Sequence, residues 1–132
     1  MRHIVKSLKE LDILAGEFAA VLKAPAAVLV SGDLGAGKTE FCRSVIRRLH
    51  GADTLVPSPT FNIVQTYGND IAHFDLYRMN SPEELEELGL DEYLQNHIVF
   101  IEWPDLAKPL VKNPIRVEIR NLAKDVREIN IY

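Results

Sequence analysis

The feature that most constrains this chain is a glycine-rich segment between two regular elements. Residues 26–30 before it are wholly apolar, which is typical of a strand buried on both faces of a parallel sheet. Residues 38–49 after it have the pattern of a helix that ends near Gly51. The segment itself reads Gly32-Asp33-Leu34-Gly35-Ala36-Gly37-Lys38-Thr39. Strand, glycine-rich turn and helix in this order predict a phosphate-binding loop.

The residue types of this loop suit a triphosphate bound with Mg²⁺. Its glycines allow positive φ and a close approach of backbone N–H groups to phosphate oxygens. Lys38 would reach the β- and γ-phosphates, and the Thr39 hydroxyl would bind Mg²⁺. A chance match in an ordinary turn is the alternative, but the flanking strand and helix favour nucleotide binding. The expected ligand contacts come from Asp33, Leu34, Gly35, Ala36, Gly37, Lys38 and Thr39.

Composition predicts a single globular domain over residues 1–132. Hydrophobic residues make up 47% of the chain and charged residues 26%, which is ordinary for a chain with its own core. The net charge of −4 argues against a basic nucleic-acid-binding surface, so tRNA or DNA would be reached only through a partner. A single cysteine, Cys42, and the lack of a membrane-length apolar run or secretory signal predict a cytoplasmic protein.

The rest of the pattern predicts an α/β fold of the P-loop NTPase type. Two strand-like runs, 61–67 and 71–77, flank a short glycine-containing turn and predict an antiparallel hairpin. The sheet should therefore be mixed, with helices packed on both faces. Further elements are expected as helices at 8–23 and from Ser81 to Gly89, a short helical turn at 91–94, a buried strand at 98–101, and late antiparallel strands at 115–120 and 127–132.

Two carboxylates are candidates to complete the site. Glu102 follows a wholly apolar strand, so its side chain should emerge at the sheet edge beside the loop and help to organise Mg²⁺. Asp75 ends the second strand of the hairpin and competes for the same role. Periodicity alone favours Glu102 over a solvated acid at a strand end, and leaves Asp75 open.

Other residues have two readings each. Residues 57–60, Pro-Ser-Pro-Thr, could sense the γ-phosphate or form a rigid turn, and the pattern by itself favours the turn. Trp103 could stack on a base or partner, or be buried in the core. His73 is interpreted as a sheet histidine rather than a ligand, and Cys42 as a small residue packed on its helix rather than a nucleophile.

Five motifs occur along the chain: the loop at 32–39, Ser58-Pro59-Thr60-Phe61, His73-Phe74-Asp75-Leu76-Tyr77-Arg78, Pro82-Glu83-Glu84-Leu85 and Glu102-Trp103-Pro104. In order and spacing, over about residues 7–132, they resemble one family, the bacterial TsaE (YjeE) proteins. The loop is shared with many NTPases, whereas the combination is far more specific. Two positions depart from the family pattern: Leu11 stands where a threonine is frequent, and Glu40 follows Thr39 where a small or polar residue is usual.

The resemblance implies an ATPase that acts in the threonylcarbamoyl modification of adenosine 37 of tRNA, together with TsaB and TsaD. It further implies residue roles. Thr39 and Glu102 would bind Mg²⁺, and Asp75 would be needed for hydrolysis together with the loop lysine, Lys38. Trp103 and Arg127 would lie near the nucleotide, and Ser58, Pro59 and Thr60 would form a switch loop.

The leading functional hypothesis is therefore a Mg²⁺-dependent ATPase, slow without its partners because no arginine finger is evident near the loop. A small-molecule kinase shares the loop but needs an arginine-bearing lid, for which the chain is short. A guanine-nucleotide switch lacks its Asn-Lys-x-Asp motif here. A module that binds ATP without hydrolysing it is the third alternative.

Overall fold

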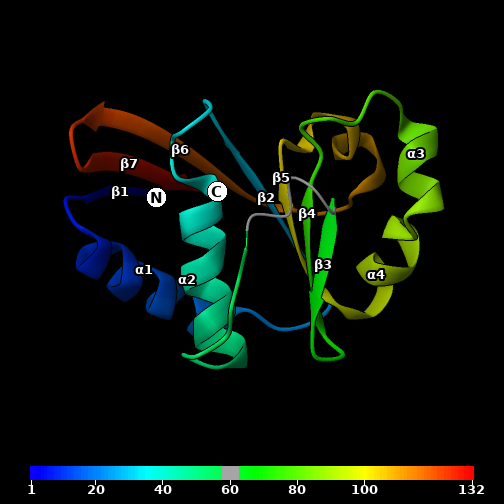
Figure 1. Cartoon of the computed structure of the whole chain (residues 1–132), viewed down its shortest axis with the longest axis horizontal. Coiled ribbons are helices and arrows are strands. Elements are labelled where there is room, and N and C mark those ends of the chain that lie inside the picture. The colour runs from blue at the N-terminus through cyan, green and yellow to red at the C-terminus, as the bar shows by residue number, and fades with distance from the viewer. Residues whose placement is uncertain (58–62) are drawn as a thin grey trace.

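The structure, a computed structural model, describes residues 1–57 and 63–132. The strands form one seven-stranded sheet in the order β1-β7-β6-β2-β5-β4-β3 (Figure 1). The strands are β1 (Arg2–Val5), β2 (Ala26–Gly32), β3 (Val64–Tyr67), β4 (Ile71–Asp75), β5 (Ile98–Glu102), β6 (Ile115–Ala123) and β7 (Val126–Ile131). The helices are α1 (Leu8–Val21), α2 (Lys38–His50), α3 (Pro82–Glu87) and α4 (Leu90–Asn96), with 3₁₀ turns η1 (Pro104–Leu106) and η2 (Lys108–Leu110).

The sheet is mixed, as the sequence predicts. Strand β2 runs parallel to β5 and β6, and β4 runs parallel to β5. The pairs β3–β4, β6–β7 and β1–β7 are antiparallel. The predicted hairpin is confirmed, with Tyr67 opposite Ile71 and Gly68 in the turn at φ 63°. Glycine suits this position because residues with a side chain rarely adopt a left-handed backbone conformation.

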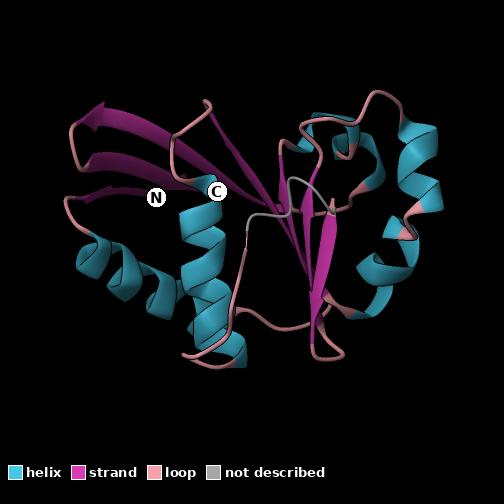
Figure 2. Ribbon diagram, in the orientation of Figure 1, coloured by secondary structure: helices cyan, strands magenta, loops and turns pink. Residues whose placement is uncertain are grey.

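Helices cover both faces of the sheet (Figure 2), which confirms the predicted layers. On one face α1 and α2 enclose a core with Val28, Val30 and Phe100, among others. On the other face α3 and α4 pack with residues such as Leu29 and Ile101. Alternate residues of β2 and β5 thus enter different cores, which explains why β2 is apolar up to Val30 and β5 up to Ile101.

The largest departure from expectation is β1, because the sequence pattern does not predict a strand there. Its exposed or half-exposed residues, apart from Val5, pair with β7 at the edge of the sheet. Helix α1 begins where expected, and the Ser7 hydroxyl accepts a hydrogen bond from the Glu10 N–H at 3.1 Å. It ends at Val21 rather than at residue 23.

The topology brings the carboxyl ends of three parallel strands to one edge. Val30 of β2 lies opposite Glu102 of β5, which lies opposite Asp75 of β4. Strand β2 continues there into the glycine-rich segment and α2. Ligands of open α/β sheets bind at such edges. Among the described residues, no helix combines the length and apolar character needed to span a bilayer.

Candidate functional site

The glycine-rich segment forms a tight loop between β2 and α2. A Cβ on Gly32 would lie 2.5 Å from the carbonyl oxygen of Ile119, which no side chain tolerates. Gly37 has φ 103°, and a Cβ there would meet the Arg127 guanidinium at 3.0 Å. The loop therefore needs glycine at both positions, for packing at Gly32 and for backbone conformation at Gly37.

Lys38 lies under the loop rather than in solvent. Its Nζ donates hydrogen bonds to the carbonyl oxygens of Gly32 and Asp33, both at 2.7 Å, and lies 4.0 Å from the centre of the Trp103 ring. Burial lowers the pKa of the Lys38 ammonium below its ordinary value, and the nearby carboxylates of Glu102, Asp75 and Asp33 oppose this shift. The ammonium group thus contacts two carbonyl oxygens and the face of the Trp103 indole, beside the cavity.

Thr39 and Glu102 meet across the gap between α2 and β5. The Thr39 hydroxyl donates to Oε1 of Glu102 at 2.8 Å and lies 3.0 Å from Oε2. Glu102 is 2% exposed, and its Oε2 lies 2.6 Å from Nε2 of His73. A hydroxyl and a carboxylate are the hard oxygen donors that Mg²⁺ prefers. The residues present therefore fit a magnesium ion, and the metal-binding role of Thr39 and Glu102 stays a prediction.

Asp75 lies on the neighbouring strand at the same level. It is buried, and its Oδ1 accepts a hydrogen bond from the backbone N–H of Tyr77 at 3.0 Å. Because Asp75 and Glu102 are paired in register, two acids stand side by side next to Lys38. Desolvated like charges of this kind favour binding of a cation between or near them.

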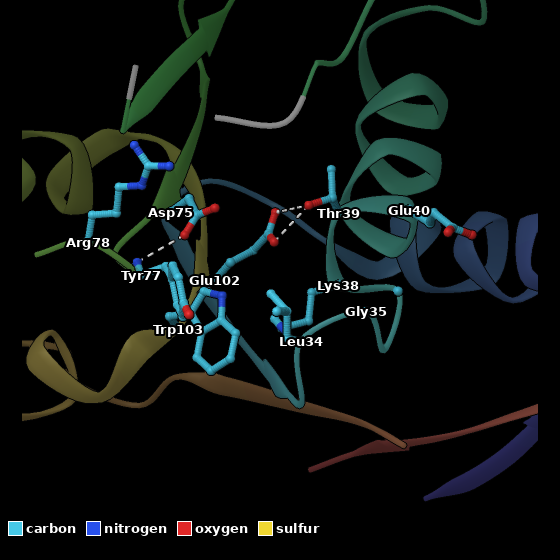
Figure 3. Close-up of a pocket in the computed structure, with 11 residues that line it drawn as sticks. Leu34, Gly35, Lys38, Thr39, Glu40, Asp75, Tyr77, Arg78, Glu102 and Trp103 are labelled. Carbon is cyan, nitrogen blue, oxygen red and sulfur yellow. Dashed lines mark hydrogen bonds between the residues drawn. The ribbon is translucent and has the colours of Figure 1, made fainter. Parts of the chain in front are cut away.

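These groups line a cavity of about 310 Å³ (Figure 3). The cavity is lined by Leu34, Gly35, Gly37, Lys38, Thr39, Glu40, Asp75, Tyr77, Arg78, Glu102 and Trp103. Most of the predicted site residues are thus brought together. Asp33 and Ala36 belong to the loop but not to the lining; the Ala36 N–H donates to the Asp33 carbonyl at 3.0 Å. Ser58, Pro59 and Thr60 lie outside the described residues.

Arg127 lies on the other side of the loop. Its guanidinium donates to Glu40 Oε2 at 3.1 Å and packs against Gly37. It lines a second hollow of about 510 Å³, together with Val5, Lys6, Ser7, Leu8, Glu40 and Asp125. Glu40 lines both cavities. Glu40, which departs from the family pattern, forms an ion pair with Arg127, which the resemblance places near the nucleotide. Leu11 is 2% exposed and belongs to the core, away from both linings.

The sequence interpretation missed three neighbours of the site. The ring of Tyr77 packs against that of Trp103, with ring centres 4.8 Å apart and planes tilted by 46°. Trp103 has a left-handed backbone (φ 55°), and its ring lies over Lys38. Arg78 lines the cavity, although the sequence shows no arginine finger near the loop. His73 contacts Glu102 directly. All three residues lie in the family motif over residues 73–78, and this motif was the sequence feature that could have indicated their place at the site.

Trp103 is half-buried at the cavity wall, so it is not a core tryptophan. Cys42 is fully buried in α2, as its interpretation as a packing residue requires. Burial, reinforced by Glu102 and Asp75, raises the pKa of its thiol well above the ordinary value, which disfavours a nucleophilic role.

Comparison with known proteins agrees with the geometry. A protein of Rickettsia bellii called tRNA threonylcarbamoyladenosine biosynthesis protein TsaE is 46% identical over 132 residues, covering 97% of this chain and 92% of the relative. The Bacillus subtilis protein of the same name is 36% identical over 126 residues, covering 92% and 78%. The crystal structure of YdiB from Bacillus subtilis superposes with a TM-score of 0.81 at 27% identity, covering 99% of this chain and 83% of that one.

The family comparison covers almost the whole chain. Residues 5–129 match the family described as threonylcarbamoyl adenosine biosynthesis protein TsaE. This range includes the loop, Asp75, Glu102, Trp103 and Arg127. The chain belongs to the TsaE family.

Proposed function

We propose that this chain is a Mg²⁺-dependent ATPase that supports threonylcarbamoylation of adenosine 37 in tRNA. One observation carries the proposal: the Thr39 hydroxyl and the Glu102 carboxylate meet at 2.8 Å beside a glycine-rich loop that contains Lys38. That arrangement supplies oxygen donors for a metal next to N–H donors and an ammonium for phosphates. We further infer that the continuous sheet makes residues 1–132 one domain.

In the proposed reaction, a water oxygen attacks the γ-phosphorus, the bond from this phosphorus to the β–γ bridging oxygen breaks, and ADP and inorganic phosphate are released. Loop N–H groups other than that of Ala36, which donates to the Asp33 carbonyl, would hold the phosphates, and Lys38 would leave the Gly32 and Asp33 carbonyls to contact the β- and γ-oxygens. Thr39 and Glu102 would hold Mg²⁺, which neutralises developing charge on the phosphates when bound. Asp75, one strand away, would orient the attacking water.

The nucleoside would extend from the phosphates towards Arg127. The second hollow adjoins the loop through Glu40 and offers the apolar side chains of Val5 and Leu8 beside that arginine. Trp103 and Tyr77 pack against each other in the wall of the first cavity, next to Lys38, where they would exclude water from the phosphates.

We place the ATPase in a complex of the TsaB–TsaD type. The curated relatives carry a tRNA-modification name, and the net charge of −4 gives this chain no general attraction for tRNA. The tRNA would therefore be contacted through the partners. ATP turnover would reset the complex between modification cycles.

The deciding experiment is release of phosphate from γ-labelled ATP, with and without TsaB–TsaD, by the wild type and by Lys38→Ala. The proposal predicts Mg²⁺-dependent transfer of the label to water and a large loss in Lys38→Ala. Transfer of label to a small molecule from a metabolite extract would identify a kinase instead. Tight ATP binding with no release in any mixture would identify a binding module.

Partner choice is tested by pull-down of TsaB–TsaD with the wild type in ATP and in ADP. The proposal predicts an association that depends on the nucleotide. No association in either state would contradict the partner assignment while leaving the ATPase assignment intact.

A further inference from the structure

His73 is a buried polar residue at the base of the site that the proposed reaction does not use. Its side chain is 0% exposed, and it lies in β4 two residues before Asp75. The flanking residues Ala72 and Phe74 enter the core of α3 and α4, so His73 points to the opposite face, towards α2. The histidine therefore lies directly under the pair formed by Thr39 and Glu102.

The contact between His73 and Glu102 is short and buried. Nε2 of His73 lies 2.6 Å from Oε2 of Glu102, with both side chains almost fully excluded from solvent. Glu102 is thus held from two sides, by the Thr39 hydroxyl at the cavity and by the imidazole below. A carboxylate that binds a cation accepts hydrogen bonds, so a role in metal binding requires both neighbours to act as donors to it.

An apolar residue would fill this place at a lower cost of burial. A buried imidazole loses its hydration and needs a hydrogen bond in return. Within residues 1–57 and 63–132, Nδ1 of His73 has no hydrogen-bond partner, which leaves the bond to Glu102 as the compensating contact. In the same ranges no lysine or arginine forms an ion pair with Glu102. The imidazole is therefore the main restraint on the buried side of this carboxylate.

We propose that His73 is a positioning residue that fixes the Glu102 carboxylate towards Thr39 and thereby sets the affinity of the site for magnesium. Residues that hold a metal ligand from behind typically change metal affinity or activity by about 10- to 100-fold when removed. The inference rests on the proposed function, because it concerns the same metal. It adds a residue whose effect is on metal binding rather than on contact with ATP.

The test compares His73→Phe, which keeps a ring but removes the donor, with His73→Gln, whose amide nitrogen can replace Nε2 as donor. Phe74→Leu, on the same strand but facing the other core, controls for loss of packing. Binding of ATP is followed by the fluorescence of Trp103, the single tryptophan, at increasing Mg²⁺. This readout does not require hydrolysis. Circular dichroism checks folding.

We expect His73→Phe to raise the Mg²⁺ concentration for half-maximal effect by about tenfold or more, with ATP binding in EDTA unchanged. His73→Gln should recover most of this loss, and Phe74→Leu should match the wild type. A folded His73→Phe with wild-type Mg²⁺ dependence, or a folded His73→Gln as impaired as His73→Phe, would overturn the inference alone. A wild type that binds no nucleotide would overturn the proposed function and this inference together.

If His73→Phe does not fold, proton NMR of the ¹⁵N-histidine-labelled wild type decides. The Nε2 proton of His73 should exchange slowly with solvent and shift when Mg²⁺ and ATP are added. A proton that is absent from Nε2, or one that does not respond, would overturn the inference.

Discussion

Two buried glutamates show how differently this fold treats the same side chain. Glu128 lies in the antiparallel region of β1, β6 and β7, where Arg2 donates to it at 2.8 Å and Asn130 at 2.9 Å, and Arg120 lies 3.8 Å away. Glu102 lies at the end of a parallel strand, held by a hydroxyl and an imidazole. The first carboxylate is neutralised by arginine, whereas the second has its charge left for a cation.

This difference separates a part of the molecule that stabilises the fold from the part that we propose binds the nucleotide and its metal. The ion-paired carboxylate ties the edge strand β1 to β7 across 126 residues of sequence. The other carboxylate stands beside Asp75 and the loop, where two neighbouring acids would be stabilised further by a bound cation. Substitution of Glu102 should therefore lower activity more than stability. Substitution of Glu128 should lower stability and leave activity unchanged.

The largest effect is expected for Lys38→Ala. Removing the ammonium that stabilises phosphate charge should lower kcat/KM for ATP by about 1,000-fold. The folded state should tolerate the change, since burial already disfavours the charged form. Steady-state phosphate release and thermal unfolding measure both quantities. Near-normal turnover would show that the loop is not the catalytic phosphate site.

Glu102→Gln tests the ligand-binding glutamate. We expect kcat to fall by about 100-fold because a metal ligand is lost. ATP binding in EDTA should be as tight as in the wild type or tighter, since a carboxylate no longer repels the triphosphate. Unfolding by urea should show no loss of stability. A destabilised variant with normal turnover would reverse the comparison between the two glutamates.

Asp75→Asn should lower kcat by roughly tenfold or more while KM for ATP changes little, because the proposed role is to orient water rather than to bind the nucleotide. Mg²⁺ titration of the same variant separates its role from that of Glu102. An unchanged kcat with a raised Mg²⁺ requirement would make Asp75 the metal ligand instead.

Glu128→Gln should have the smallest effect, a modest loss of stability with ATP turnover unchanged. The hydrogen bond from Arg2 lowers the pKa of Glu128 below its ordinary value of 4.5. The ionised form is therefore favoured by folding, and its contribution is present above that ordinary pKa and lost as pH falls through the lowered one. Urea unfolding at neutral and acidic pH should show a weaker acid dependence in the variant. Equal dependence in both proteins would contradict the assigned role of Glu128.

The sequence predicts the positions of the loop and of Glu102 well, because both positions follow from local sequence patterns. Glycines at fixed spacing before a lysine define the loop, and an apolar run ending in an acid defines the strand end. The hairpin, the mixed sheet and the two helix layers follow from similar patterns. In contrast, the strand order that places Asp75 beside Glu102 is not readable from any one segment.

The contacts that the sequence could not supply join residues far apart in the chain. Strand β1 has little apolar character and forms because β7 offers it an edge. The pairing of Glu40 with Arg127 depends on the return of β7 past the loop. His73 reads as an ordinary sheet residue until β5 is placed next to β4. The assigned roles of Ser58, Pro59 and Thr60 stay predictions.

A crystal structure with Mg²⁺ and a non-hydrolysable ATP analogue tests the central claim most directly. We predict Mg²⁺ at about 2.1 Å from the Thr39 hydroxyl oxygen, with Glu102 bound to the ion or to one of its waters. Nζ of Lys38 should leave the Gly32 and Asp33 carbonyls for the phosphates. Phosphates bound elsewhere, with Lys38 still on those carbonyls and no metal at Thr39, would contradict the account.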